Sequence, residues 1–178
     1  RNRELGFFTH RIGQDIRQIL LLAKNPGDGE LFMNVYYKMG TYMNKQTANQ
    51  VCQLARRHSM GVLDAAIEMG HLSPHPMKGC QMVRRNLRLL KEDNASMAIQ
   101  RITGPMGYSE YLQRSGLRDN KLAILRILAR QEPNIDGFLN RLESLEQLLL
   151  HKESDPDCPL ILSTIHGSKG LEYDIVYL

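Results

Sequence analysis

Residues 45–70 read KQTANQVCQLARRHSMGVLDAAIEMG, and this stretch decides the fold class of the chain. In its first half, small and apolar side chains recur at three- and four-residue steps, at Ala48, Val51, Cys52 and Ala55. This is the spacing of one face of an amphipathic helix, so the stretch predicts a helix over 45–58. A second helix is predicted over 62–69, between Gly61 and Gly70. Helix therefore follows helix, which indicates a mainly α fold.

The same periodicity continues outward in both directions. It predicts further helices over 10–24, 30–39, 79–92, 95–102, 109–114, 121–130 and 135–150. Asp28 and Asn134 stand at positions suited to cap the helices that follow them. The prolines at 74 and 76 predict a loop over 71–76. After residue 155 the sequence pattern changes from helical to strand-like. Residues 160–166 and 173–178 are predicted to be short buried strands joined by a glycine-bearing turn.

Composition narrows the class of protein. The 178 residues are 42% hydrophobic and 24% charged, which is typical of a globular protein. No apolar run approaches the ~20 residues of a membrane span, and the N-terminus does not resemble a signal peptide, so we expect a cytoplasmic protein with no membrane partner. The 23 basic and 19 acidic residues give a net charge of +4, which is compatible with a polyanionic partner. A first residue of Arg1 rather than Met indicates a segment of a longer protein.

Cysteine and histidine residues do not predict a metal site. Cys52, Cys80 and Cys158 are odd in number and widely separated, so we expect free thiols rather than disulfides or zinc ligands. His71 and His75 lack a nearby framework of cysteines or carboxylates and read as loop histidines.

The stretch 162–173, LSTIHGSKGLEY, strongly resembles motif V of superfamily 1 helicases of the UvrD/Rep/PcrA type. The family pattern is close to T-x-H-x-[SA]-K-G-L-E-[FY], and every fixed position is met. Alone, the G-S-K-G string would read as a turn with an exposed lysine. It is not a phosphate-binding P-loop, which needs a glycine directly before the lysine. The whole run over 164–173 carries the resemblance.

The chemistry of this motif suits a nucleic-acid backbone. Thr164 and His166 are two residues apart in a predicted strand, so they project from the same face and can donate to phosphate or sugar. Ser168 and Lys169 add a hydroxyl and a positive charge at the turn. The resemblance implies that these residues contact single-stranded DNA. It further implies that Gly170 and Glu172 contact the nucleotide, the glutamate at its ribose.

A weaker resemblance lies at the other end, where residues 7–16, FFTHRIGQDI, are similar to the family's F-F-x-x-x-E-I-K-D-[AIV] segment. In the family this segment opens a helix of the second RecA-like domain, ahead of a helical insertion that ends before motif V. The resemblance thus implies that the chain consists of three parts. They are the N-terminal edge of RecA-like domain 2 over 1–27, a helical insertion subdomain over 28–152, and returning RecA-like strands with motif V over 153–178.

Two features of the helical part are candidates for binding duplex DNA. Better-known helicases of the family carry a G-I-G hairpin in this insertion, and the matching region here is 39–47, which lacks the paired glycines. Lys45 can still meet a phosphate at a helix N-terminus, although a capped surface helix is an equal alternative. The second feature is the basic set Arg84, Arg88 and Lys91, which falls on one face at helical steps. Such a set can be a phosphate track or simply a solvated face.

The residues and the resemblance together predict a mainly helical segment of an ATP-dependent DNA helicase or translocase. Its partners would be DNA and the missing RecA-like domains. ATP and magnesium would bind the full-length parent, while the segment alone holds no identifiable catalytic residue and should bind neither. The alternatives are a regulatory module that docks protein or duplex DNA, and a nuclease-fused helicase of the AddA or RecB kind.

Overall fold

The computed structural model describes residues 11–117 and 120–150, and this part of the chain is helical. Its α-helices are α2 (Arg11–Lys24), α3 (Gly29–Val35), α4 (Lys45–His58), α5 (Val62–Met69), α6 (Pro74–Leu89), α7 (Ala95–Thr103), α8 (Tyr108–Arg114), α9 (Asn120–Ala129) and α10 (Ile135–Leu150). A 3-10 helix, η1 (Tyr36–Lys38), follows α3. The prediction of a mainly α fold is confirmed. The predicted strands over 160–166 and 173–178 lie outside the described residues.

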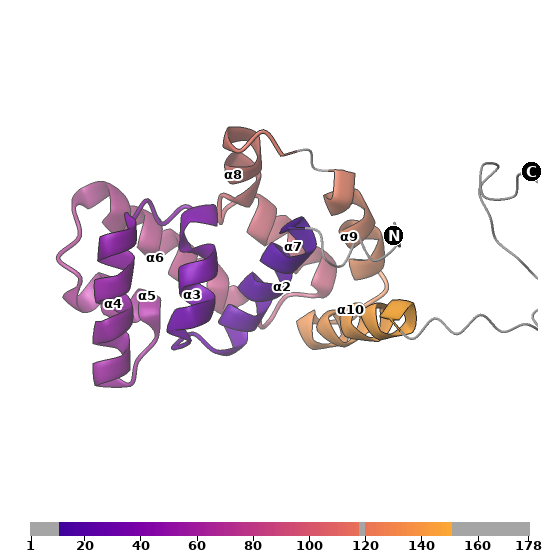
Figure 1. Cartoon of the computed structure of the whole chain (residues 1–178), viewed down its shortest axis with the longest axis horizontal. Helices are drawn as coiled ribbons and strands as arrows, with labels where there is room; N and C mark the ends of the chain where they lie inside the picture. The colour runs from indigo at the N-terminus through magenta and orange to yellow at the C-terminus, as the bar shows by residue number, and fades with distance from the viewer. Residues whose placement is uncertain (1–10, 118–119, 151–178) are drawn as a thin grey trace, which may run out of the picture.

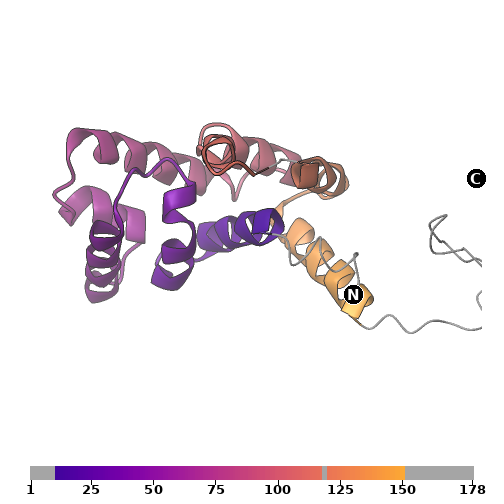
Figure 2. The same cartoon turned by 45° about the horizontal axis from the view of Figure 1, so that its top comes forward.

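The helices form an elongated body with α4 and α5 at one end and α9 and α10 at the other (Figure 1). The view turned by 45° keeps this order, with the purple α4 and the orange α10 far apart (Figure 2). Between the two ends lies α2, which contacts α3, α6, α7, α9 and α10. The first described helix therefore occupies the centre of the body rather than its margin.

Apolar side chains at helical spacing explain this central position. Five large ones on α2 are almost completely buried, namely Ile12, Ile16, Ile19, Leu20 and Leu22. Two ion pairs also tie α2 to α10, Arg17 with Glu146 at 3.1 Å and Lys24 with Asp136 at 2.6 Å. The division at residues 27 and 28 stays a prediction, but α2 shares one hydrophobic core with the helices that follow it.

Side-chain caps begin several helices, and two of them are at the capping residues predicted from the sequence, Asp28 and Asn134. The carboxylate of Asp28 accepts from the backbone N–H of Leu31 at 2.9 Å, and the Asn44 amide oxygen accepts from Thr47 at 2.8 Å. The predicted cap at Asn134 is confirmed, because its amide oxygen accepts from the N–H of Gly137 at 2.9 Å. Each cap satisfies a backbone donor that has no partner within its helix.

The predicted loop over 71–76 is wrong in its second half, because α6 begins at Pro74. Ser73 is the N-cap residue, so Pro74 and Pro76 both stand in the first turn of the helix. Proline is tolerated there, since the first backbone N–H groups of a helix have no intrahelical acceptor. The helix predicted over 30–39 is also shorter than expected and ends in η1.

A close approach of backbones fixes the turn before α4. The N–H of Gly40 donates to the carbonyl of Met106 at 2.9 Å. Gly79 of α6 lies so close that a Cβ there would sit 2.2 Å from the Gly40 oxygen. This glycine lets α6 pack directly onto the turn that leads into α4.

A buried charged network joins α2, η1 and α8. The ammonium of Lys38 donates to Asp15 at 2.6 Å, and the Tyr108 hydroxyl donates to the other carboxylate oxygen at 2.9 Å. Burial, and then the neighbouring Asp15 charge, raise the pKa of the Tyr108 hydroxyl far above its ordinary value of 10.0. Tyr108 therefore stays protonated and remains a donor to Asp15.

Candidate nucleic-acid interface

The three residues of the predicted basic set, Arg84, Arg88 and Lys91, do not lie together on one face of α6. Arg84 and Arg88 turn toward α5, where both donate to the same oxygen of Asp64, at 3.2 and 2.7 Å. Lys91 is exposed but follows the end of α6 at Leu89. The structure thus brings Arg84 and Arg88 together on one carboxylate and leaves Lys91 beyond the helix.

Asp64 is well placed to hold these arginines. It stands in the first turn of α5, where the backbone N–H groups favour a negative charge. Only 23% of its side chain is exposed, against 29% for Arg84 and 65% for Arg88. The Arg84 contact is therefore partly shielded from solvent, whereas the Arg88 contact is an exposed pair of low stability.

Lys45 is exposed in the first turn of α4, as the predicted phosphate contact would require. The turn before it has an unusual backbone, because Tyr42 has a φ of 53°. A non-glycine residue rarely adopts this left-handed conformation. The region that matches the G-I-G hairpin lacks the paired glycines, and a left-handed position in it is occupied by Tyr42.

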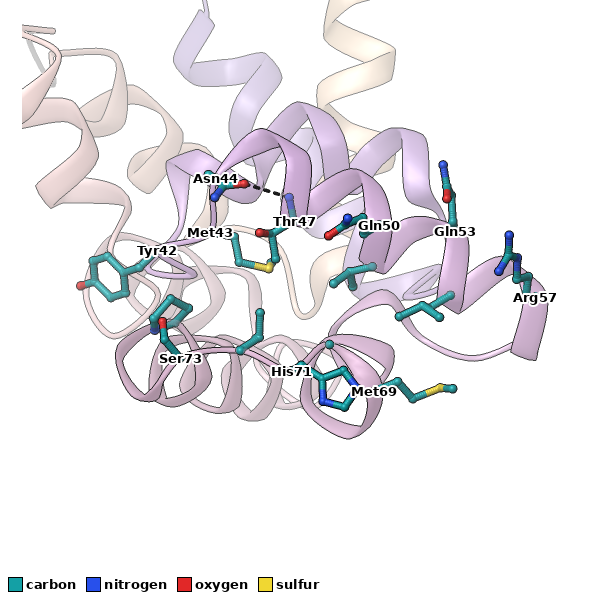
Figure 3. Close-up of a pocket in the computed structure, with 15 residues that line it drawn as sticks. Tyr42, Met43, Asn44, Thr47, Gln50, Gln53, Arg57, Met69, His71 and Ser73 are labelled. Atoms are coloured by element: carbon teal, nitrogen blue, oxygen red, sulfur yellow. Dashed lines mark hydrogen bonds between the residues drawn. The ribbon is translucent and has the colours of Figure 1, made fainter.

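A groove runs beside α4, and we call it the α4 groove (Figure 3). Its volume is about 560 Å³. One wall is a face of α4, and the opposite wall is the segment between α5 and α6. Its apolar lining is Met43, Val51, Leu54, Met69, Leu72 and Pro76. Its polar lining consists of neutral side chains together with Arg57 and His71, and it includes no carboxylate. The groove could therefore hold an apolar or mildly acidic ligand.

Two histidines lie close to this groove. The ring of His75 packs against Tyr42 at a centroid distance of 4.2 Å, and His71 lines the groove itself. Over residues 11–117 and 120–150, no three His, Cys, Asp or Glu side chains are grouped so that they could hold a metal ion. Neither does any helix of that part have the length and apolar character needed to cross a membrane.

The predicted motif V contacts belong to another part of the chain. Thr164, His166, Ser168, Lys169, Gly170 and Glu172 all lie outside the described residues. Their roles stay predictions.

Two curated proteins are similar to the chain, and both are named as DNA helicases. The “Putative ATP-dependent DNA helicase YjcD” of Bacillus subtilis (strain 168) is 24% identical over 180 residues, covering 97% of this chain. The “F-box DNA helicase protein 1” of Schizosaccharomyces pombe (strain 972 / ATCC 24843) is 37% identical over 71 residues, covering 40% of this chain. The chain is thus distantly similar to two proteins that are named as DNA helicases.

The chain spans only 23% of the length of the first relative, and its match covers 8% of the second. No protein-family model matches the chain. No solved structure matches it significantly.

Proposed function

We propose that this chain is the helical accessory part of an ATP-dependent DNA helicase or translocase and that it contacts DNA directly. The observation that carries the proposal is the similarity to a protein named as an ATP-dependent DNA helicase, which covers 97% of the chain. The motif V resemblance supports membership of the UvrD/Rep type in superfamily 1. The net charge of +4 suits a DNA partner. The protein acts in the cytoplasm.

DNA contact is divided between two parts of the chain. Thr164, His166, Ser168 and Lys169 contact single-stranded DNA, while Lys45 at the start of α4 contacts a duplex phosphate. ATP and magnesium bind the full-length protein, and Gly170 and Glu172 are this chain's contribution to the nucleotide site. When bound, ATP would supply the energy for movement along the strand.

Titration of the 178-residue chain with fluorescent single-stranded and forked DNA tests this division. We expect the fork to bind more tightly, and both affinities to fall steeply between about 50 and 200 mM salt. Substituting Thr164→Ala and His166→Ala should weaken single-strand binding, whereas Lys45→Gln should weaken fork binding by a few-fold. Failure of the wild-type chain to bind either DNA at low salt would rule out direct DNA contact.

The α4 groove favours a second candidate function, docking of a protein partner. Its apolar lining suits an apolar segment of another protein, and apolar contacts are insensitive to ionic strength. A partner whose affinity is unchanged by salt and is lost in Leu54→Asp would support this function. A partner whose affinity is unchanged in Leu54→Asp would exclude the groove as its site.

A further inference from the structure

The outer face of α6 carries a stripe that differs from the one the sequence suggests. Lys78, Gln81, Arg85 and Arg88 follow one another at steps of three, four and three residues, and all four are exposed. This spacing keeps them on one side of the helix, over a length of about 15 Å at 1.5 Å per residue. We call them the α6 stripe.

Shallow hollows lie on both sides of this stripe. Both are lined by Gln81, Arg85 and Leu89. One also includes Lys78 and Arg101, and the other includes Arg84 and Arg88. Neither lining contains an acidic residue. An anion bound in either hollow would therefore contact cationic side chains, and no carboxylate in the lining would repel it.

The ion pairs of this region decide which cations are available. Asp93 binds Arg101 through two hydrogen bonds of 2.5 and 2.9 Å, and Asp64 binds Arg84 and Arg88. In the part of the chain that the structure describes, no carboxylate lies within ion-pair distance of Lys78 or Arg85. These two stripe residues can therefore bind an external anion without breaking an internal pair.

Arg88 is the cation that can change partner. Its side chain is 65% exposed, and an exposed ion pair contributes only about 0–1 kcal/mol. A phosphate offers a guanidinium charge-assisted hydrogen bonds of at least equal strength. If Arg88 leaves, Asp64 keeps Arg84 and is not left without a partner. Exchange of Arg88 from Asp64 to a phosphate thus costs little.

The chemistry of the stripe favours duplex over single-stranded nucleic acid. Single-strand sites combine cations with aromatic rings on which bases stack. The uncharged side chains that line the two hollows are aliphatic or amide, namely Gln81, Met82, Asn86 and Leu89. The aromatic pair of Tyr42 and His75 is part of neither lining. A straight row of cations with one amide donor matches the phosphates of a regular duplex backbone.

We infer that the α6 stripe binds the phosphate backbone of duplex DNA, with Lys78 and Arg85 as primary contacts and Arg88 released from Asp64 as a third. This inference rests on the proposed function, because it assumes that DNA is the partner. The sequence pattern alone suggests Arg84, Arg88 and Lys91 as the DNA contacts of this region. The inference keeps Arg88 and assigns the other contacts to Lys78 and Arg85.

The experiment compares variants of the 178-residue chain by fluorescence anisotropy with a blunt duplex and a single strand of equal length. Lys78→Gln with Arg85→Gln removes the primary contacts. Arg114→Gln with Arg130→Gln removes the same charge from exposed positions outside α6. Far-UV circular dichroism and urea unfolding establish that each variant is folded.

We expect the stripe variant to bind the duplex at least about tenfold more weakly at about 50 mM salt, and its salt slope to fall by about 1.8. The difference from wild type should therefore shrink about tenfold by about 200 mM salt. The control variant should lose less than about threefold, because its charges act only at long range. Single-strand affinity should change little in either variant.

Asp64→Asn tests the exchange of Arg88. This change removes the carboxylate that holds both Arg84 and Arg88, so we expect tighter duplex binding and a steeper salt dependence. Adding Arg88→Gln should remove most of this gain, whereas adding Arg84→Gln should leave most of it. Equal losses in the stripe and control variants, with wild-type duplex binding intact, would overturn the stripe but leave the proposed function standing. A wild-type chain that binds neither DNA would instead overturn the proposed function itself.

Discussion

At the scale of single residues, the absence of a side chain at Gly79 allows α6, which carries the α6 stripe, to pack against the turn before α4. A Cβ at this position would lie 2.2 Å from the Gly40 oxygen and 2.8 Å from a ring carbon of Tyr42. Alanine is favoured over glycine within a helix by about 1 kcal/mol. Backbone contact at 2.2 Å outweighs this gain, because the two segments would have to separate.

We therefore expect Gly79→Ala to lower the free energy of unfolding by about 1–3 kcal/mol, the usual effect of overpacking. Urea unfolding of the 178-residue chain measures it. Gly27→Ala is the matched control, because a Cβ there would meet nothing nearer than 3.4 Å. If Gly79→Ala were as stable as the control, the turn and α6 would not be in contact.

Cys80 of α6 gives a prediction about pH. Its side chain is completely buried, and burial raises the pKa of the thiol from 9.0 to about 11. A raised pKa in the folded state means that the thiol's stabilising contribution is complete below pH 9.0. It is lost as the pH rises toward about 11, because only the unfolded chain then ionises freely.

Between pH 9.0 and about 11 the wild-type chain should lose roughly 2–3 kcal/mol of unfolding free energy through this one group. Cys80→Ala should be less stable at neutral pH but should lack this component of the pH dependence. Urea unfolding of both proteins across this range provides the comparison. Parallel stability curves for the two proteins would show that the thiol is not buried as described.

At the scale of elements, the pairing of Asp15 with Lys38 holds three segments together without adding much net stability. Removing one partner of a buried pair costs about 3–5 kcal/mol, because the other charge is left without compensation. Replacing the whole network by apolar groups is often neutral. Asp15→Asn should therefore lower the free energy of unfolding by about 3–5 kcal/mol. Thermal unfolding of the variant and the wild-type chain measures this loss.

A triple variant, Asp15→Leu with Lys38→Met and Tyr108→Phe, should recover most of that loss. All three side chains are almost fully buried, so the replacements enter an apolar setting. A triple variant less stable than Asp15→Asn would show instead that the ionic network itself stabilises the junction of α2, η1 and α8.

The elements also show where sequence reasoning succeeds and where it stops. Helices α4 and α5 match their predicted bounds, because glycines and a capping asparagine mark their ends locally. The start of α6 was missed, since two prolines in a first turn look like a loop until the helix that contains them is seen. Periodicity likewise grouped Arg84 with Arg88 but could not show that Asp64, twenty residues earlier, binds both.

At the scale of the whole molecule, the position of α2 has a consequence for the predicted subdomain over 28–152. The fully buried side chains of this helix lie in the core that it shares with the helices on both sides. Burying one such side chain is worth about 1.5–3 kcal/mol, so five contribute on the order of 10 kcal/mol. This equals the entire stability of a typical domain.

We therefore expect a chain cut to residues 28–150 to lose cooperative unfolding, whereas one cut to residues 11–150 should keep it. Circular dichroism during thermal unfolding distinguishes the two. The shorter chain should also bind a dye specific for exposed apolar surface, because α3, α6, α7, α9 and α10 would lose their common neighbour. A cooperative transition in the 28–150 chain would mean that these helices form a core without α2, and the predicted boundary at residue 28 would then be the true one.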